Sequence, residues 1–224
     1  MFIAVIACFT GCNKDTWPQP HFILKYTTAG NTYNKEADYN SNNASYDLTP
    51  LTSISTFVLS ADSILIRFNS ELLDVDGNHQ ATVSVTKLFH RSQLDSTSTG
   101  YRIKNDNDFY SLFTAGTKQI GSDQLTGPYR EGMAIIIKDT TPYMFEPPMF
   151  TAPIAPQQDA QNSFEIMNSE TDINFISVDG LPTLQPLRLI MVTVNFKCRL
   201  YNFDSPNTER IFTNGTFQGY FRDN

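Results

Sequence analysis

Three acidic residues in the C-terminal half lie close enough in the sequence to be considered for acid–base chemistry. They are Glu165, Glu170 and Asp172. Glycoside hydrolases use two carboxyl groups about 5–9 Å apart, one as the acid and the other as the base or nucleophile. In the short loops of an acidic protein, such side chains are normally solvated surface charges. We therefore expect exposed carboxylates here rather than a catalytic pair.

A second acidic segment, Asp74–His79, reads DVDGNH and has the composition of a calcium loop. An EF-hand loop requires oxygen ligands at its first, third and fifth positions, glycine at the sixth and glutamate at the twelfth. Counted from Asp74, glycine comes fourth and Val85 occupies the twelfth position. The segment therefore predicts a polar turn between two strands.

The chain has three histidines, His21, His79 and His90, and none of them has the close spacing of a metal site. A Ser-His-Asp triad stays open, because its members can be distant in sequence, but the G-x-S-x-G elbow of one hydrolase class is absent. No phosphate loop or dinucleotide fingerprint is present either. We expect no metal, no cofactor and no enzymatic activity.

Cys12 carries a different kind of chemistry. Residues 2–9 are apolar, Thr10 and Gly11 are small, and the cysteine follows at once. The run has the length of a signal-peptide core, about 7–15 residues, and stops short of the roughly 20 that a spanning helix needs. The order resembles the lipobox of bacterial lipoprotein signal peptides, with Phe9 in place of the usual leucine-like residue. In a lipobox the cysteine is acylated and becomes the first residue of the mature chain.

This resemblance predicts a signal peptide over residues 1–11, a lipid anchor on Cys12 and a tether over residues 12–20. Signal peptides begin with basic residues, and none precedes the apolar run, so we expect the true start to lie upstream. The alternative is a mildly apolar N-terminus without order. With Cys8 removed and Cys12 acylated, Cys198 is left without a disulfide partner, and its alternating neighbours predict a buried thiol.

Composition favours a β-rich domain. The 224 residues carry a net charge of −7, only 17% of them are charged, and 17 Phe and 10 Tyr accompany a single Trp. Nucleic-acid binding needs a basic stripe, and the chain has none, so we expect no nucleic-acid partner. Aromatic residues, together with plentiful Thr, Ser and Asn, are typical of strands and turns.

Period-2 alternation, together with a nearly continuous apolar run at 132–138 that is expected to be buried on both faces, predicts many short strands. The strands predicted from this pattern cover residues 22–27, 32–35, 53–59, 63–68, 80–89, 132–138, 164–167, 174–178, 187–202 and 209–221. One helix is predicted near Asp106, capped by Asn107 or Asp108, and Asn214-Gly215 is expected to kink the last strand. The prolines of 142–156 predict a loop or an irregular edge. Residues 21–224 are therefore predicted to form a single all-β domain, an antiparallel two-sheet sandwich with one short helix.

The C-terminal hairpin resembles the ending of uncharacterised envelope lipoproteins of the Bacteroidota. The resemblance lies in residues 196–201, a polar turn, and the segment Phe212–Phe217, which reads FTNGTF where those proteins have I-T-N-G-x-F. It implies a β-rich lipoprotein of the outer membrane and carries over no activity. It also implies O-glycosylation at Asp-Ser/Thr motifs, which here would modify Ser63, Ser96 and Thr140.

Three tyrosines, Tyr33, Tyr39 and Tyr46, lie in a stretch rich in Asn and Ser. Tyrosine supplies rigid amphipathic contact area, and Asn and Ser supply adaptable hydrogen bonds. They are candidates for binding a glycan or an envelope protein, and the alternative is a loop packed by its own aromatic rings. The sequence thus predicts a membrane-anchored, non-enzymatic binding or scaffolding protein, with a carbohydrate-binding accessory of glycan uptake as the second hypothesis and a hydrolase as the third.

Overall fold

The computed structural model describes residues 21–38, 48–98, 100–121, 130–139, 141–144, 159–171, 188–205 and 207–223. The chain in these ranges is almost entirely extended. The strands are β1 His21–Thr28, β2 Asn31–Asp38, β3 Leu48–Val58, β4 Ser63–Asp74, β5 His79–His90, β6 Leu94–Thr97, β7 Gly100–Ile103, β8 Gly116–Thr117, β9 Gly132–Asp139, β10 Thr141–Met144, β11 Ser163–Glu170, β12 Arg188–Asn202 and β13 Glu209–Asp223. A helix, α1 Asp106–Ser111, and a short 3₁₀ turn, Arg91–Gln93, lie between them.

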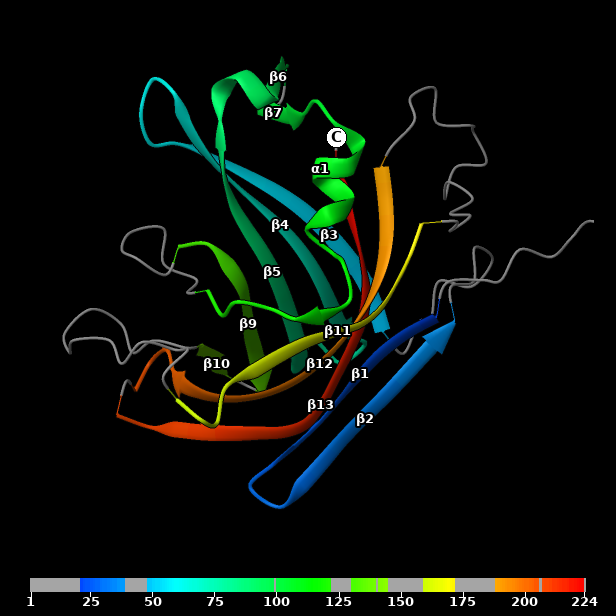
Figure 1. Cartoon of the computed structure of the whole chain (residues 1–224). Coiled ribbons are helices and arrows are strands. Elements are labelled where there is room, and N and C mark those ends of the chain that lie inside the picture. Colours follow the sequence, from blue (N-terminus) through cyan, green and yellow to red (C-terminus); the bar gives the residue numbers. More distant parts are fainter. Residues whose placement is uncertain are drawn as a thin grey trace, which may run out of the picture.

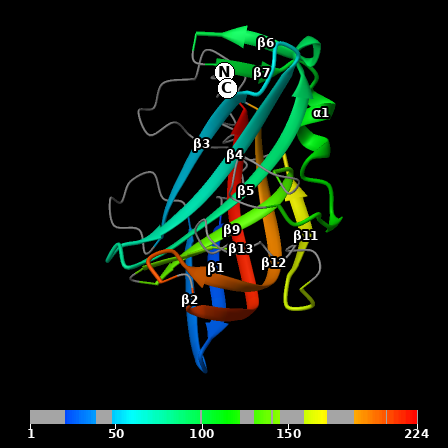
Figure 2. The same ribbon diagram turned by 90° about the vertical axis from the view of Figure 1, so that its left-hand side faces the viewer.

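One antiparallel sheet of 11 strands contains most of these elements, in the order β2-β1-β13-β12-β10-β9-β5-β4-β3. In addition, β11 pairs with β12, and β8 pairs with β11. The sheet curls into a half-barrel, and β12 and β13 bend along its wall (Figure 1). Hairpin β6–β7 is separate from the sheet and lies at the opposite end from β1–β2 (Figure 2).

The all-β prediction is confirmed, but the two-sheet sandwich is wrong. Alternating strands suit both architectures, and here the long bent strands keep the sheet continuous.

The bend has a local cause in β13. Asn214 adopts a left-handed backbone conformation with φ of 50°. Opposite it, β1 passes from Lys25 to Thr27 while β13 passes from Thr216 to Thr213, so two residues of β13 face one of β1. The ladder with β12 shifts at the same place, between Phe196 and Cys198. A β-bulge of this kind bends a strand and increases its twist, which confirms the predicted kink.

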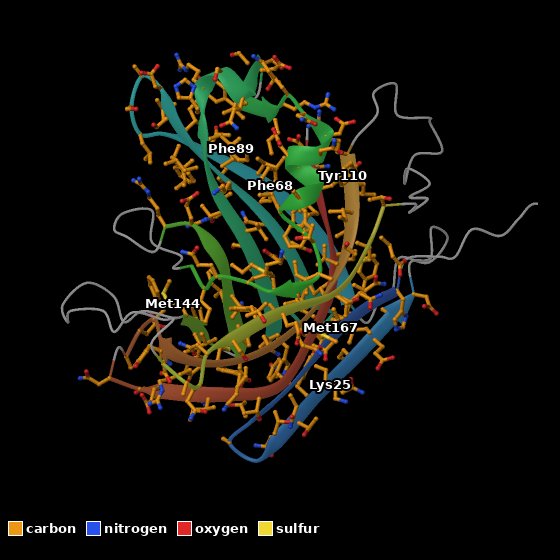
Figure 3. The ribbon with its side chains drawn as sticks, viewed as in Figure 1. Lys25, Phe68, Phe89, Tyr110, Met144 and Met167 are labelled. Carbon is orange, nitrogen blue, oxygen red and sulfur yellow. The ribbon has the colours of Figure 1, made fainter. Side chains whose placement is uncertain are left out.

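The core fills the inside of the curl. Alternate residues of the strands are buried. Phe109 of α1 and Phe113 of the turn that follows the helix cover one end of the apolar interior. The ring of Phe68 on β4 lies 5.4 Å from that of Phe109, and the ring of Phe221 on β13 lies 4.7 Å from that of Phe113. Phe68 and Tyr110 are found at this end of the curl in Figure 3. Each buried Phe contributes about 1.5–3 kcal/mol of transfer free energy.

The helix forms where it was predicted, with a different cap. Asn105, not Asn107 or Asp108, is the N-cap, and its side chain accepts a hydrogen bond of 2.9 Å from the backbone N–H of Asn107. Asp106 and Asp108 instead occupy the first turn, where negative charge is favourable. Among the described residues, no helix reaches the length and apolarity needed to cross a membrane.

One further prediction needs correction. Pro142 lies in β10, which pairs with both β9 and β12, whereas the proline-rich segment was expected to avoid the middle of a sheet. Proline lacks a backbone N–H but keeps its carbonyl, and that oxygen accepts a hydrogen bond of 2.8 Å from the N–H of Phe203. The strand is only four residues long. Residues 145–156 and the strand predicted at 174–178 lie outside the described residues.

Candidate functional site

The outer side of the curl carries an open depression of about 440 Å³. Its floor consists of three tripeptides from neighbouring strands, 163–165 of β11, 195–197 of β12 and 214–216 of β13. Lys25 of β1 borders it on one side and Thr117 of β8 on the other. The depression therefore extends across five strands at the level where β13 bulges.

The register places its side chains in a row. Lys25 pairs with Thr216, Thr216 with Asn195, Asn195 with Glu165, and Glu165 with Thr117. Residues directly opposite one another in antiparallel strands point to the same face. Four of the five are exposed and Thr216 is half-buried, so this row faces solvent. The neighbouring positions along each strand face the core instead.

A second, shorter row lies beside the first. It contains Lys197, its partner Ser163 on β11, and Asn214 at the bulge of β13. The lining of the depression thus combines two ammonium groups, one carboxylate and several amides and hydroxyls. Groups of this kind bind polar or charged ligands through hydrogen bonds and ion pairs.

Several of these groups have no partner within the described chain. The hydroxyl of Thr216 donates a hydrogen bond of 3.1 Å to Oδ1 of Asn195. The other amide atom of Asn195, Nδ2, is left as a donor. The ammonium groups of Lys25 and Lys197 form no ion pair or hydrogen bond with any other described residue, whereas the guanidinium of Arg199 contacts both Asp159 and Glu209 at 2.7–2.8 Å. The depression therefore presents unsatisfied donors.

The two aromatic residues of the depression contribute almost no accessible surface. Phe164 and Phe196, which contribute to its floor, are 0% and 3% exposed. A Cβ at Gly215 would lie 2.3 Å from the Phe196 ring. Any residue larger than glycine would therefore displace the Phe196 ring, which packs against β13 at this position. The rings pack away from solvent, and the strand backbone and the polar rows remain as the accessible surface.

Sequence reasoning did not find this surface. The alternation in residues 187–202 and 209–221 does put Asn195, Lys197 and Thr216 on the polar side of their strands. No local signal joins them to Lys25, however, because β1 pairs with β13 from the opposite end of the chain.

Tyr33, a predicted ligand-binding residue, lies on β2 at the mouth of the half-barrel. Its hydroxyl donates a hydrogen bond of 2.5 Å to Oδ2 of Asp74, and its ring stacks on Tyr26 and His79 with centroids 5.2 and 4.4 Å away. Burial, followed by the hydrogen bond to Asp74, raises the pKa of Tyr33 above its usual 10.0. Tyr39 and Tyr46 lie outside the described residues. The binding role of the three tyrosines remains a prediction.

The turn predicted at Asp74–His79 is confirmed. It joins β4 to β5, with Gly77 at φ 68° and its N–H donating to the Asp74 carbonyl over 2.8 Å. Nδ1 of His79 lies 3.7 Å from Oδ1 of Asp139. In the part of the chain that the structure describes, no group of three or more His, Cys, Asp or Glu residues could hold a metal ion.

The carboxylates considered for glycoside hydrolysis do not meet. Glu165 and Glu170 are exposed on the same strand, about 16 Å apart at 3.3 Å per residue, and Glu170 accepts a hydrogen bond from Asn168. A catalytic pair needs about 5–9 Å. Asp172 lies outside the described residues. The expectation of exposed surface charges is confirmed for the two glutamates.

The predicted modification sites are placed only in part. Ser63 begins β4 and is half-buried, and Ser96 is exposed on β6. Cys12 and Thr140 lie outside the described residues. Cys198 is fully buried, as predicted, and burial raises the pKa of its thiol well above the usual 9.0.

Comparison of the chain with protein-family models, with curated proteins and with solved structures found no match.

Proposed function

We propose that this chain is a non-enzymatic binding module of the bacterial cell envelope, held at the outer membrane by lipid on Cys12. The observation that carries the binding role is the polar depression across β1, β13, β12, β11 and β8. The apolar run that ends in Thr10, Gly11 and Cys12 supports the anchor. Two or more acyl chains give stable membrane attachment, and residues 12–20 would then form the tether to the folded domain.

The shape and lining of the depression favour binding over catalysis. Catalytic and small-molecule sites are normally concave, and they enclose most of the ligand in apolar walls. Here the surface is open, and the described residues that line it include no histidine or cysteine and a single carboxylate, Glu165. General acid–base catalysis requires groups within hydrogen-bond reach of one another. A ligand held across the sheet face needs only the donors and acceptors that the two rows supply.

A carbohydrate-binding accessory role is the second candidate. The observation that favours it is the mixture of amide, hydroxyl and carboxylate groups at Asn195, Thr117, Ser163 and Glu165, because sugar hydroxyls need both donors and acceptors. Tyr33, Tyr39 and Tyr46 could add contacts only if their rings were free, and the Tyr33 ring stacks on Tyr26 and His79.

Membrane fractionation of cells that express the native protein and two variants tests the anchor. Cys12→Ala should move the protein from the membrane to the soluble fraction, whereas the matched control Cys8→Ala should leave it anchored. Mass spectrometry of the purified native protein should find the acyl chains on Cys12. A Cys12→Ala protein that stays in the membrane fraction would overturn the lipid anchor. Protease treatment of intact cells then distinguishes a surface-facing protein, which is cleaved, from one that faces the periplasm.

A further inference from the structure

We infer that the depression binds an acidic oligosaccharide, a sugar chain that carries carboxylate groups. This inference rests on the proposed role of the chain as a binding module, and it is independent of the membrane anchor. Four properties of the two polar rows support it: their charge, their hydrogen-bonding groups, their position on the sheet, and the length of the first row from β1 to β8.

The charge comes from Lys25 and Lys197. Both line the depression, one on β1 and the other on β12, with β13 between them, and Lys25 is labelled in Figure 3. Neither ammonium has a partner among the described residues, although the protein has a net charge of −7 and so an excess of carboxylates. Several other cations of the described chain do have acidic partners, such as Lys87 with Glu131 at 3.1 Å and Arg199 with Asp159 at 2.8 Å. Two unpaired ammonium groups at one depression favour an anionic ligand.

The hydrogen-bonding groups suit sugar hydroxyls. Asn195 has its Oδ1 occupied by Thr216, which orients the amide and leaves Nδ2 as a donor. Glu165 supplies acceptors, and the hydroxyls of Ser163 and Thr117 can act either way. A hydroxyl group both donates and accepts, so this mixture matches a polyhydroxylated ligand better than donors alone would.

The position on the sheet argues against a peptide. An extended peptide gains affinity by adding a strand to a free sheet edge, where it can pair its main chain. The depression lies on the face of the sheet, over β11, β12 and β13, and their backbone groups are already paired with neighbouring strands. A peptide here would have only side-chain contacts. The buried rings of Phe164 and Phe196 likewise offer little surface to an apolar ligand.

The length of the first row points to a chain of several sugar units. From Lys25 to Thr117 the row crosses from β1 to β8 in four steps between neighbouring strands. At about 4.8 Å per step this is roughly 19 Å. A single sugar ring would cover only part of this row, so binding should strengthen with the number of linked units.

Calorimetric titration of the intact lipidated protein in detergent micelles tests the inference with four probes. These are monogalacturonate, tetragalacturonate, the uncharged maltotetraose and tetraglutamate. We expect tetragalacturonate to bind at least tenfold more tightly than each of the other three.

The affinity for tetragalacturonate should fall at least tenfold in the double variant Lys25→Gln/Lys197→Gln. The matched control Lys35→Gln removes a positive charge from β2 outside the depression and should leave the affinity unchanged. Unfolding temperatures of the three proteins should agree, because the substituted side chains are exposed or half-buried and unpaired.

Each contrary result has a distinct meaning. Equal binding of tetraglutamate would show a general anion site and overturn the sugar assignment, and equal binding of maltotetraose would overturn the acidic one. Tetragalacturonate binding that survives in the double variant would place the site elsewhere on the molecule. If none of the probes binds, the inference fails. The anchored envelope protein proposed above fails separately, by the behaviour of Cys12→Ala in membrane fractions.

Discussion

Tyr33 on β2 donates a hydrogen bond of 2.5 Å to Oδ2 of Asp74 at the end of β4, across 41 residues of sequence. The two strands lie at opposite ends of the sheet order, which starts at β2 and finishes with β4 and β3. The contact therefore joins the two ends of the curl at one mouth of the half-barrel. Tyr26 and His79 complete this junction, with the Tyr26 hydroxyl 3.3 Å from Nδ1 of His79.

Tyr33→Phe should destabilise the fold. Asp74 is 4% exposed, and its other oxygen, Oδ1, has no hydrogen-bond partner among the described residues, so loss of the tyrosine hydroxyl leaves a buried carboxylate poorly satisfied. A hydrogen bond to a charged group contributes about 1.5–3 kcal/mol. Urea unfolding should show a loss of about 2 kcal/mol. Tyr101→Phe is the matched control, because Tyr101 accepts an exposed hydrogen bond from Arg91, and it should cost less than about 0.5 kcal/mol. Equal effects of the two substitutions would show that the junction adds no stability.

The same junction predicts a loss of stability in alkali. Burial is the largest cause that raises the pKa of both Tyr26 and Tyr33 above the usual 10.0. A group whose pKa is raised by folding stabilises the native state fully below the pKa it has when unfolded, and that contribution is lost as the pH rises further. The free energy of unfolding should therefore fall as the pH rises above about 10.

The measurement is urea unfolding at a series of alkaline pH values, with phenolate absorbance recorded in parallel. The decline should be shallower in Tyr33→Phe than in the native protein. A native phenolate titration that is complete near pH 10 would contradict the buried junction.

Gly215 is predicted to be intolerant of a side chain. A Cβ at this position would lie 2.3 Å from the Phe196 ring, so Gly215→Ala must displace that ring or the bulged strand. Overpacking of this kind costs about 1–3 kcal/mol. In a Phe196→Leu background the further cost of Gly215→Ala should be at least halved, because the clashing ring is gone. A thermal-unfolding double-mutant cycle measures the difference, and additive effects would disprove the proposed contact.

Local pattern was enough to predict many of the strands. The alternation at 63–68, 80–89, 187–202 and 209–221 reports which side of a strand is buried, and these segments became β4, β5, β12 and β13. The bulge at Asn214-Gly215 was also predictable from local sequence, because Asn and Gly both tolerate unusual backbone angles. What alternation does not report is the partner of each strand. A sandwich and a curled sheet bury the same residues, so the choice between them depended on long-range pairings such as β1 with β13.

The candidate site was missed for a related reason. Lys25 and Asn195 are ordinary polar residues on the outward faces of two distant strands. They line the same depression only because the pairing register links β1, β13 and β12. Tyr33, by contrast, was singled out for its residue type and its surroundings in sequence. That signal does not reveal that its hydroxyl is used within the fold by Asp74.

Arg188 should be a major source of stability at the end of the half-barrel covered by α1. Its guanidinium contacts Oδ2 of Asp223 at 2.8 Å and Oδ1 of Asp106 at 2.6 Å, and Asp223 is 1% exposed. Arg188→Leu removes the ion-pair partner of that buried carboxylate and leaves it with the Ile103 backbone N–H and the charge of Arg102. Breaking a buried ion pair costs about 3–5 kcal/mol. The side chain of Asp106 is 68% exposed, so the control Asp106→Asn should cost less than about 1 kcal/mol. Urea denaturation measures both, and an Arg188→Leu effect no larger than the control would contradict this role.

The number of cysteines that a thiol reagent labels, before and after unfolding, tests both the burial of Cys198 and the processing of the chain. Its side chain is fully buried, and burial raises the pKa of its thiol well above the usual 9.0, so neither access nor the reactive thiolate is available in the native state. The sequence contains three cysteines. If Cys8 is removed with the signal peptide and Cys12 is acylated, maleimide should label no cysteine in the native protein and only Cys198 after unfolding in guanidinium. Mass spectrometry of the labelled chain identifies the site. Labelling of native Cys198 would contradict the buried position, whereas an additional label on Cys12 would contradict lipidation and leave the fold untouched.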